Sequence, residues 1–201
     1  PYDTIKLIDS EREAIIDLGE MKAIVFTTGT STSERPLTTE EFFSFINSRA
    51  PDQLVRSLDS NFLLGIYAYT PRETFAVFKV NSYDSAFAGM LQWEPNIESD
   101  IGDIFINKKD RVDRDVTSTS TIQVNVSTTT QDEGSSQYGI FSQRKFVDRV
   151  YNNKDVRVLV DSNGKEALLY SFIDKETLVI ATTDKSLKEI LFNLTTGRII
   201  R

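Results

Sequence analysis

The sequence predicts an α+β fold in which antiparallel β hairpins carry helices packed on one face. Two stretches lead to this prediction, 62–93 and 168–194. Each contains two segments rich in apolar and β-branched residues, with a turn signal between them and a helical pattern after the second. The 201 residues, 39% hydrophobic and 26% charged, are typical of a globular protein with an ordinary core.

The first stretch is expected to form a hairpin followed by a helix. Its strands are 62–69 and 73–80, and Pro71 suits the turn because its ring presets the backbone dihedral. Asn81 or Ser82 can cap the helix by accepting a hydrogen bond from its first amides. The helix then places apolar side chains on one side at three- and four-residue spacing: Tyr83, Phe87, Met90 and Leu91.

Two capping boxes predict helix starts before this hairpin, because a Ser or Thr can bond the amide three residues on while a Glu reaches back. Ser10 with Glu13 predicts a helix over 11–18, and Thr38 with Glu41 predicts a second helix. That second helix is expected to bury Phe42, Phe45 and Ile46. The other segments are an edge strand over 2–8, a strand over 22–28, a polar loop over 29–36 and a short helix after Pro51.

The C-terminal part is expected to contain short strands and one helix. The strands are 155–161, 166–173 and 177–182, with Asn163-Gly164 at the first turn because both residues tolerate positive φ. Thr183 can cap the last helix, and Gly197 can end it. The pattern of 145–151 fits more than one structure.

The domain organisation has two alternatives. The chain forms a single domain over 1–201, or two tightly joined and similar strand–strand–helix halves, 1–106 and 138–201. A duplication and a chance likeness of two such units explain the similarity equally well. The Ser/Thr-rich segment 107–137 is expected to be an insertion on the domain surface, since each half alone would have a thin core.

The composition excludes several chemistries. Cysteine and histidine are both absent, so disulfides, Cys/His zinc sites and hydrolases with a histidine base are excluded. The net charge of −7 repels polyanions, and no nucleic-acid partner is expected. Because no nucleotide-binding or metal-binding motif occurs, we expect no cofactor and no metal, and we assign no catalytic residue.

Four aromatic side chains are candidates for a ligand-binding groove: Tyr67, Tyr69, Tyr83 and Trp93. Alternation along a strand places Tyr67 and Tyr69 on the same face. Rings of this kind can line a site for a saccharide or a peptide. The other interpretation is that they belong to the core and its rim.

Four acids follow Trp93: Glu94, Glu98, Asp100 and Asp103. Paired carboxylates can hydrolyse a glycosidic bond or hold a hard cation, but like charges at this spacing also occur on solvated helix faces. Pro95 lies among these acids and is expected to break the helix, because it lacks an amide hydrogen and clashes with the preceding turn. The helical pattern then resumes up to Phe105.

Three stretches together carry a resemblance to a family. They are 54–66, with LVRSL and FLLGI, then 81–94, with NSYDSAFAGMLQWE, and 153–180, with NKDVRVL, LYSF and TLVI. The chain resembles the C-terminal soluble region of uncharacterised, predicted membrane-anchored proteins of candidate-phylum bacteria with small genomes. The resemblance implies an extracytoplasmic location and a single membrane helix before Pro1. No activity is established for that family, so it implies no site residue.

Three functions follow as hypotheses. The first is a non-enzymatic domain with a structural or protein-interaction role at the cell envelope, contacting an envelope or surface protein, which predicts an exposed apolar patch or a free strand edge. The second is a saccharide- or peptide-binding module, which predicts a concave pocket lined by the four rings. The third is a carboxylate-based hydrolase, which predicts two carboxylates roughly 5–10 Å apart in one cleft. The lack of a recognisable catalytic spacing favours the first.

Overall fold

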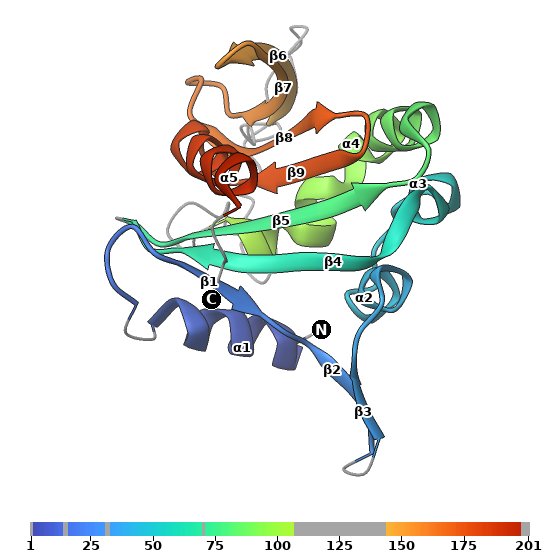
Figure 1. The fold of residues 1–201 in the computed structure, drawn as a ribbon. Helices are drawn as coiled ribbons and strands as arrows, with labels where there is room; N and C mark the ends of the chain where they lie inside the picture. The colour runs from blue at the N-terminus through green and yellow to red at the C-terminus, as the bar shows by residue number, and fades with distance from the viewer. Residues whose placement is uncertain (1, 14–15, 31–32, 70, 107–143, 198–201) are drawn as a thin grey trace, which may run out of the picture.

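The centre of the fold is a seven-stranded antiparallel sheet with the strand order β1-β4-β5-β9-β8-β7-β6 (Figure 1). The computed structural model describes residues 2–13, 16–30, 33–69, 71–106 and 144–197. The strands of the sheet are β1 (Met21–Ile24), β4 (Leu58–Tyr67), β5 (Glu73–Val80), β6 (Lys145–Tyr151), β7 (Lys154–Val160), β8 (Glu166–Asp174) and β9 (Thr177–Ala181). The α+β fold with antiparallel hairpins is therefore confirmed.

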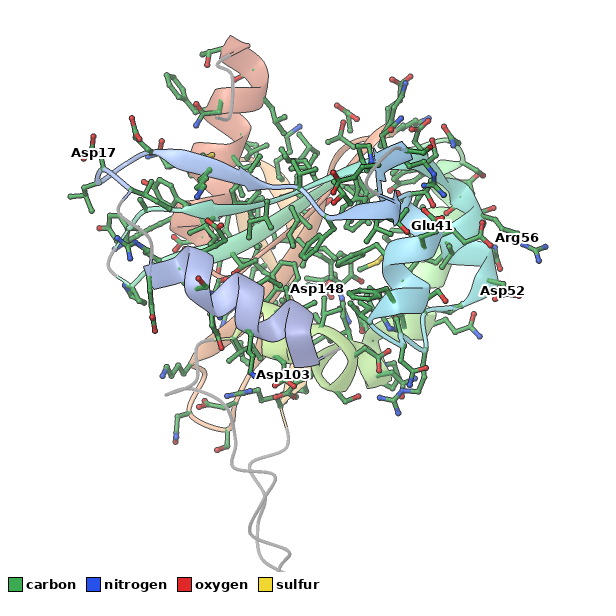
Figure 2. All side chains as sticks on the ribbon, turned by 90° about the horizontal axis from the view of Figure 1, so that it is seen from below. Asp17, Glu41, Asp52, Arg56, Asp103 and Asp148 are labelled. Carbon is green, nitrogen blue, oxygen red and sulfur yellow. The ribbon has the colours of Figure 1, made fainter. Side chains whose placement is uncertain are left out.

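Helices cover both faces of the sheet. They are α1 (Tyr2–Glu13), α2 (Thr39–Phe45), α3 (Asp52–Ser57), α4 (Tyr83–Phe105) and α5 (Asp184–Thr196). The first four contribute to one core cluster, whereas α5 packs on the opposite face (Figures 1 and 2). The expectation of helices on one face thus describes α1–α4 but not α5. The reason lies in the central and C-terminal strands, which are apolar on both faces and need cover on each.

The larger core lies between α4 and the sheet. Trp93, Met90 and Ile97 of α4 are at most 1% exposed and share this cluster with Phe78 and Leu168 of the strands. The smaller core lies under α5, whose buried Leu187 and Ile190 join a second set of strand side chains: Val158, Leu169 and Val179. Alternation along each strand divides its side chains between the two cores.

Local signals place several element ends where the sequence predicts them. The Thr38 side chain accepts a hydrogen bond from the Glu41 amide at 3.3 Å, and Glu41 accepts one from the Thr38 amide at 2.9 Å. Thr183 caps α5 by accepting a bond from the Ser186 amide at 3.2 Å. Gly197 ends α5 with a φ of 64°. These three predictions are confirmed because each depends on contacts within a few residues.

Strand β6, which the sequence left open, is joined to β7 by a two-residue turn. Asn152 and Asn153 occupy this turn with φ of 51° and 60°. Asparagine tolerates such dihedrals, and a turn with two positive φ values matches the twist of the paired strands. The turn brings β7 back along β6, which is the edge strand of the sheet.

The N-terminal helix differs from the sequence prediction. Helix α1 begins at Tyr2, so the edge strand over 2–8 is wrong, and Ser10 lies within the helix instead of capping it. Ile8 is completely buried, and Arg12, one turn later, donates to the Thr74 hydroxyl at 2.7 and 3.1 Å. These long-range contacts outweigh the local capping pattern.

Helix α4 passes through Pro95 without the predicted break. A proline inside a helix costs roughly 3 kcal/mol, because it removes one hydrogen bond and crowds the preceding turn. Trp93 and Ile97 on either side of it are 1% and 0% exposed. Burying each large apolar side chain contributes roughly 1.5–3 kcal/mol, which offsets the cost of the proline.

Two smaller corrections concern the segment before β4. The stretch 29–36, expected to be a loop, contributes to a two-stranded sheet of β2 (Thr27–Thr30) and β3 (Ser33–Pro36), and all of β3 is exposed. In α2, Phe43 is 5% exposed and packs in the core, whereas Phe45 is 45% exposed. The predicted insertion over 107–137 lies outside the described residues.

Candidate ligand-binding groove

A groove of about 590 Å³ lies between the N-terminal half of α4 and the strands β7 and β8. Its α4 wall consists of Tyr83, Phe87 and Leu91, which recur every four residues and therefore face the same way. Phe172 of β8 lies on the opposite wall. The volume falls within the usual range for ligand sites, which is roughly 300–1,000 Å³.

The aromatic side chains of the groove hold one another in place. The Tyr83 and Phe87 rings stack with centroids 5.9 Å apart, and Phe172 meets Tyr83 edge-on at 5.2 Å. Phe87 and Leu91 remain 39% and 40% exposed. The result is a fixed apolar surface that is open to solvent, next to the polar side chains of β7.

A charged network joins α4 to the strands beneath the groove. Arg157 of β7 donates two parallel hydrogen bonds to Glu94 of α4, at 2.8 and 2.7 Å. The Tyr170 hydroxyl donates to the same carboxylate at 2.7 Å, and Arg157 also donates to Asp148 of β6 at 2.9 Å. Because the network spans three strands and a helix, it fixes the distance between the two walls.

Two members of this network, Arg157 and Tyr170, have raised pKa values. The hydrogen bonds to Glu94 raise the pKa of Arg157 above its ordinary value. Burial, and then the hydrogen bond to Glu94, raise the pKa of Tyr170 well above the usual tyrosine range. Arg157 therefore stays charged and Tyr170 stays protonated near neutral pH. The network has a positioning role and does not offer a proton for transfer.

The structure does not bring the four predicted aromatic residues together. Tyr83 lines the groove, but Trp93 is 1% exposed in the core and donates its indole N–H to Asp100 at 2.8 Å. The Tyr67 and Tyr69 rings stack on each other at 5.8 Å, and Tyr67 belongs to the core under α5. The Lys185 ammonium lies 5.1 Å from the Tyr69 ring centre.

Three of the four acids after Trp93 bind separate arginines. Glu94 pairs with Arg157, and Glu98 pairs with Arg144. Asp100, whose side chain is 3% exposed, accepts bonds from the Arg49 guanidinium at 2.7 Å and from the Arg49 amide at 2.8 Å. These arginines come from three different segments of the chain. The geometry therefore does not favour two of these acids acting together on one substrate.

Sequence reasoning missed several residues of the groove. Phe87 and Leu91 belong to the predicted apolar stripe but not to the four predicted ligand-binding aromatics. Phe172 and Arg157 were not singled out at all. Arg157 is a lone cation in the apolar strand VRVLV, and such a residue needs a carboxylate partner when it faces a helix. That signal points to an acid on α4, though not to Glu94 in particular.

Comparison with protein-family models found no match, and neither did comparison with curated proteins or with solved structures. Among the described residues, none of the helices has the combined length and apolar character needed to cross a bilayer. The same residues contain no cluster of three or more acidic side chains arranged to hold a metal ion. The groove is therefore interpreted from its own geometry.

Proposed function

We propose that this chain is a non-enzymatic binding module whose groove receives a short peptide segment of a partner protein. One observation carries this proposal: Tyr83, Phe87 and Leu91 form an ordered apolar wall that stays open to solvent in a concave site. Exposed apolar side chains next to polar ones are typical of sites that bind proteins or ligands.

The two walls suit a peptide better than a saccharide. A saccharide stacks on a free aromatic face and needs both donors and acceptors for its hydroxyl groups. Here Tyr83 is packed against Phe87 and Phe172, and Leu91 presents only methyl groups. A peptide can place apolar side chains against this wall and polar ones against β7, as an amphipathic segment does in other grooves.

The location of the module is part of the same proposal. The family resemblance supports an extracytoplasmic position, on a membrane anchor that precedes Pro1, and a partner at the cell envelope. A domain held near a membrane meets its partner at raised effective concentration, so a groove of modest affinity is sufficient there.

A selection from random peptides tests the proposed function. Short peptides displayed on phage are selected on the immobilised 1–201 chain, and enriched sequences are measured by fluorescence anisotropy. We expect Phe87→Ala to weaken their binding at least about tenfold, because truncating an apolar anchor commonly costs more than about 1.4 kcal/mol.

Phe45→Ala is the matched control, because Phe45 is 45% exposed on α2 and lies away from the groove. It should bind the selected peptides as the unchanged chain does. Failure to enrich any peptide, or binding indifferent to Phe87→Ala, would rule out the peptide site. If a panel of glycans showed Phe87-dependent binding instead, the site would be assigned to a saccharide.

A further inference from the structure

We infer that the groove selects peptides with basic side chains, a conclusion that rests on the proposed function and specifies its partner. The inference comes from the balance of hydrogen-bond donors and acceptors around the groove. Most of the donors on its strand wall are bonded within the protein, whereas two of its carboxylates, those of Asp148 and Asp155, are exposed. An occupant must then supply donors, and Lys and Arg supply them together with a positive charge.

Most side-chain donors of the strand wall already have a protein acceptor, the Asn153 amide at the β6–β7 turn being the exception among the described residues. Arg157 donates to Glu94 and Asp148. The Lys154 ammonium donates to the Ile173 carbonyl at 2.8 Å, and the Ser171 hydroxyl donates to the Asp155 carbonyl at 2.7 Å. Tyr170, the remaining hydroxyl on this wall, donates to Glu94.

The acceptors are available to a ligand. The exposed Asp155 carboxylate lines the groove, and within the described part of the chain it has no hydrogen bond or ion pair. Among the residues that the structure describes, Asp148 bonds only Arg157, and its side chain is 86% exposed.

The local charge points the same way. Three carboxylates at the groove, those of Glu94, Asp148 and Asp155, stand against the two cations Lys154 and Arg157. The whole chain carries a net charge of −7. A basic segment is therefore attracted at long range and paired at short range, whereas an acidic segment is repelled.

Three amphipathic peptides of equal length test the inference, with leucine alternating with lysine, glutamine or glutamate. Binding to the 1–201 chain is measured by fluorescence anisotropy at low and at raised salt. The lysine peptide should bind about tenfold tighter than the glutamine peptide, because each of two exposed ion pairs raises the affinity by about threefold and the two factors multiply. Added salt should reduce this preference.

The double variant Asp148→Asn with Asp155→Asn should remove most of the preference and leave the glutamine peptide unaffected. Asp17→Asn is the matched control, because Asp17 is exposed beside β1, at the opposite edge of the sheet from β6 (Figure 2). The Asp17→Asn variant should bind the lysine peptide and the glutamine peptide as the unchanged chain does.

The outcomes separate this inference from the proposed function. If the glutamine peptide binds as tightly as the lysine peptide and Phe87→Ala weakens both, the groove binds peptides without selecting charge, and the inference fails alone. If the preference survives the double variant, the charge recognition lies elsewhere, and the inference also fails. If no peptide binds, or if Phe87→Ala affects none of them, the proposed function fails and the inference fails with it.

Discussion

Glu94 shows how a single side chain can organise the interface between a helix and a sheet. Its carboxylate accepts bonds from Arg157 of β7 and from Tyr170 of β8, and its side chain is 15% exposed. A bidentate arginine–carboxylate pair fixes direction as well as distance. Removing either partner would leave the other charge poorly solvated, so the network specifies the position of α4 more than it adds stability.

Glu73 is the buried acid with the clearest effect on pH dependence. It is 3% exposed at the start of β5 and accepts a hydrogen bond from the Thr183 hydroxyl at 2.7 Å. Burial raises the pKa of Glu73, and hydrogen bonds from Thr183 and Ser186 oppose this rise without cancelling it. The folded protein therefore binds this proton more tightly than the unfolded chain does.

We expect Glu73→Gln to stabilise the protein at neutral pH and not in acid. The stability that the protonated carboxyl contributes is complete below its unfolded pKa, near 4.5, and is lost as the pH rises through the higher folded value. Glutamine stays neutral and can still accept from Thr183. Thermal unfolding from pH 4 to pH 7 should show a Tm difference that grows with pH.

Glu20→Gln is the control for this change, because Glu20 is an exposed glutamate just before β1 and lies in no helix. Its Tm should follow that of the unchanged protein at every pH. If the Tm of Glu73→Gln differed from that of the unchanged protein by the same amount at every pH, the change would be a packing effect and would contradict the proton linkage.

At the level of single residues, the sequence indicates which side chains are aromatic and helical, but it does not indicate what surrounds them in the fold. Tyr83 and Trp93 are both helical aromatics after a hairpin, yet one lines the groove and the other is core. Trp93 packs against Phe43 of α2, whereas Tyr83 packs against Phe172, which lies some ninety positions further along the chain. Local pattern carries no information about such a partner.

Among the helices, α4 shows how close packing can override helix propensity. Gly89 lies inside the helix, where alanine is usually better by about 1 kcal/mol. A Cβ at this position would lie 2.6 Å from the Leu54 Cβ and 2.9 Å from the Leu54 Cα. Leu54 is a fully buried residue of α3, so its backbone cannot move aside without repacking.

We therefore expect Gly89→Ala to destabilise the protein by about 1–3 kcal/mol, because the overpacking outweighs the gain in propensity. Urea unfolding measures this value. Ala88→Gly at the adjacent exposed position is the control and should cost about 1 kcal/mol from propensity alone. A more stable Gly89→Ala variant would show that α3 and α4 can separate, contrary to this packing.

Element ends were predictable where a few neighbouring residues decide them. The capping boxes at Thr38 and Thr183 are present because their bonds are made within one turn. The similar pattern at Ser10 failed because Ile8 and Arg12 make contacts with distant strands and with α4. Pro95 was misjudged for the same reason, since the burial that retains it comes from the sheet.

At the scale of the whole molecule, the two strand–strand–helix units share one sheet. Strand β5 pairs with β9, so the hairpins β4–β5 and β8–β9 are joined at the centre. A twofold axis normal to the sheet would interchange these antiparallel hairpins and would keep each helix on its own face. Because α4 and α5 lie on opposite faces, that operation does not relate the helices. The duplication remains a prediction that concerns the hairpins.

The joined sheet predicts that neither half folds alone. The junction buries Ala76 and Phe78 of β5 against Leu178 and Ile180 of β9, each at most 2% exposed. Separating the halves would expose these side chains, leave two strand edges unpaired and remove Arg157 from Glu94. Fragments 1–106 and 138–201 should each lack a cooperative thermal transition by circular dichroism.

Co-expression of the two fragments completes this test, because the contacts at the junction do not require a continuous chain. The fragments should copurify and together recover the cooperative transition of the 1–201 chain. If fragment 1–106 unfolded cooperatively by itself, the β5–β9 junction would be an interface between two autonomous domains. The groove would then form only where those domains meet, because its walls come from α4 in one half and from β7 and β8 in the other.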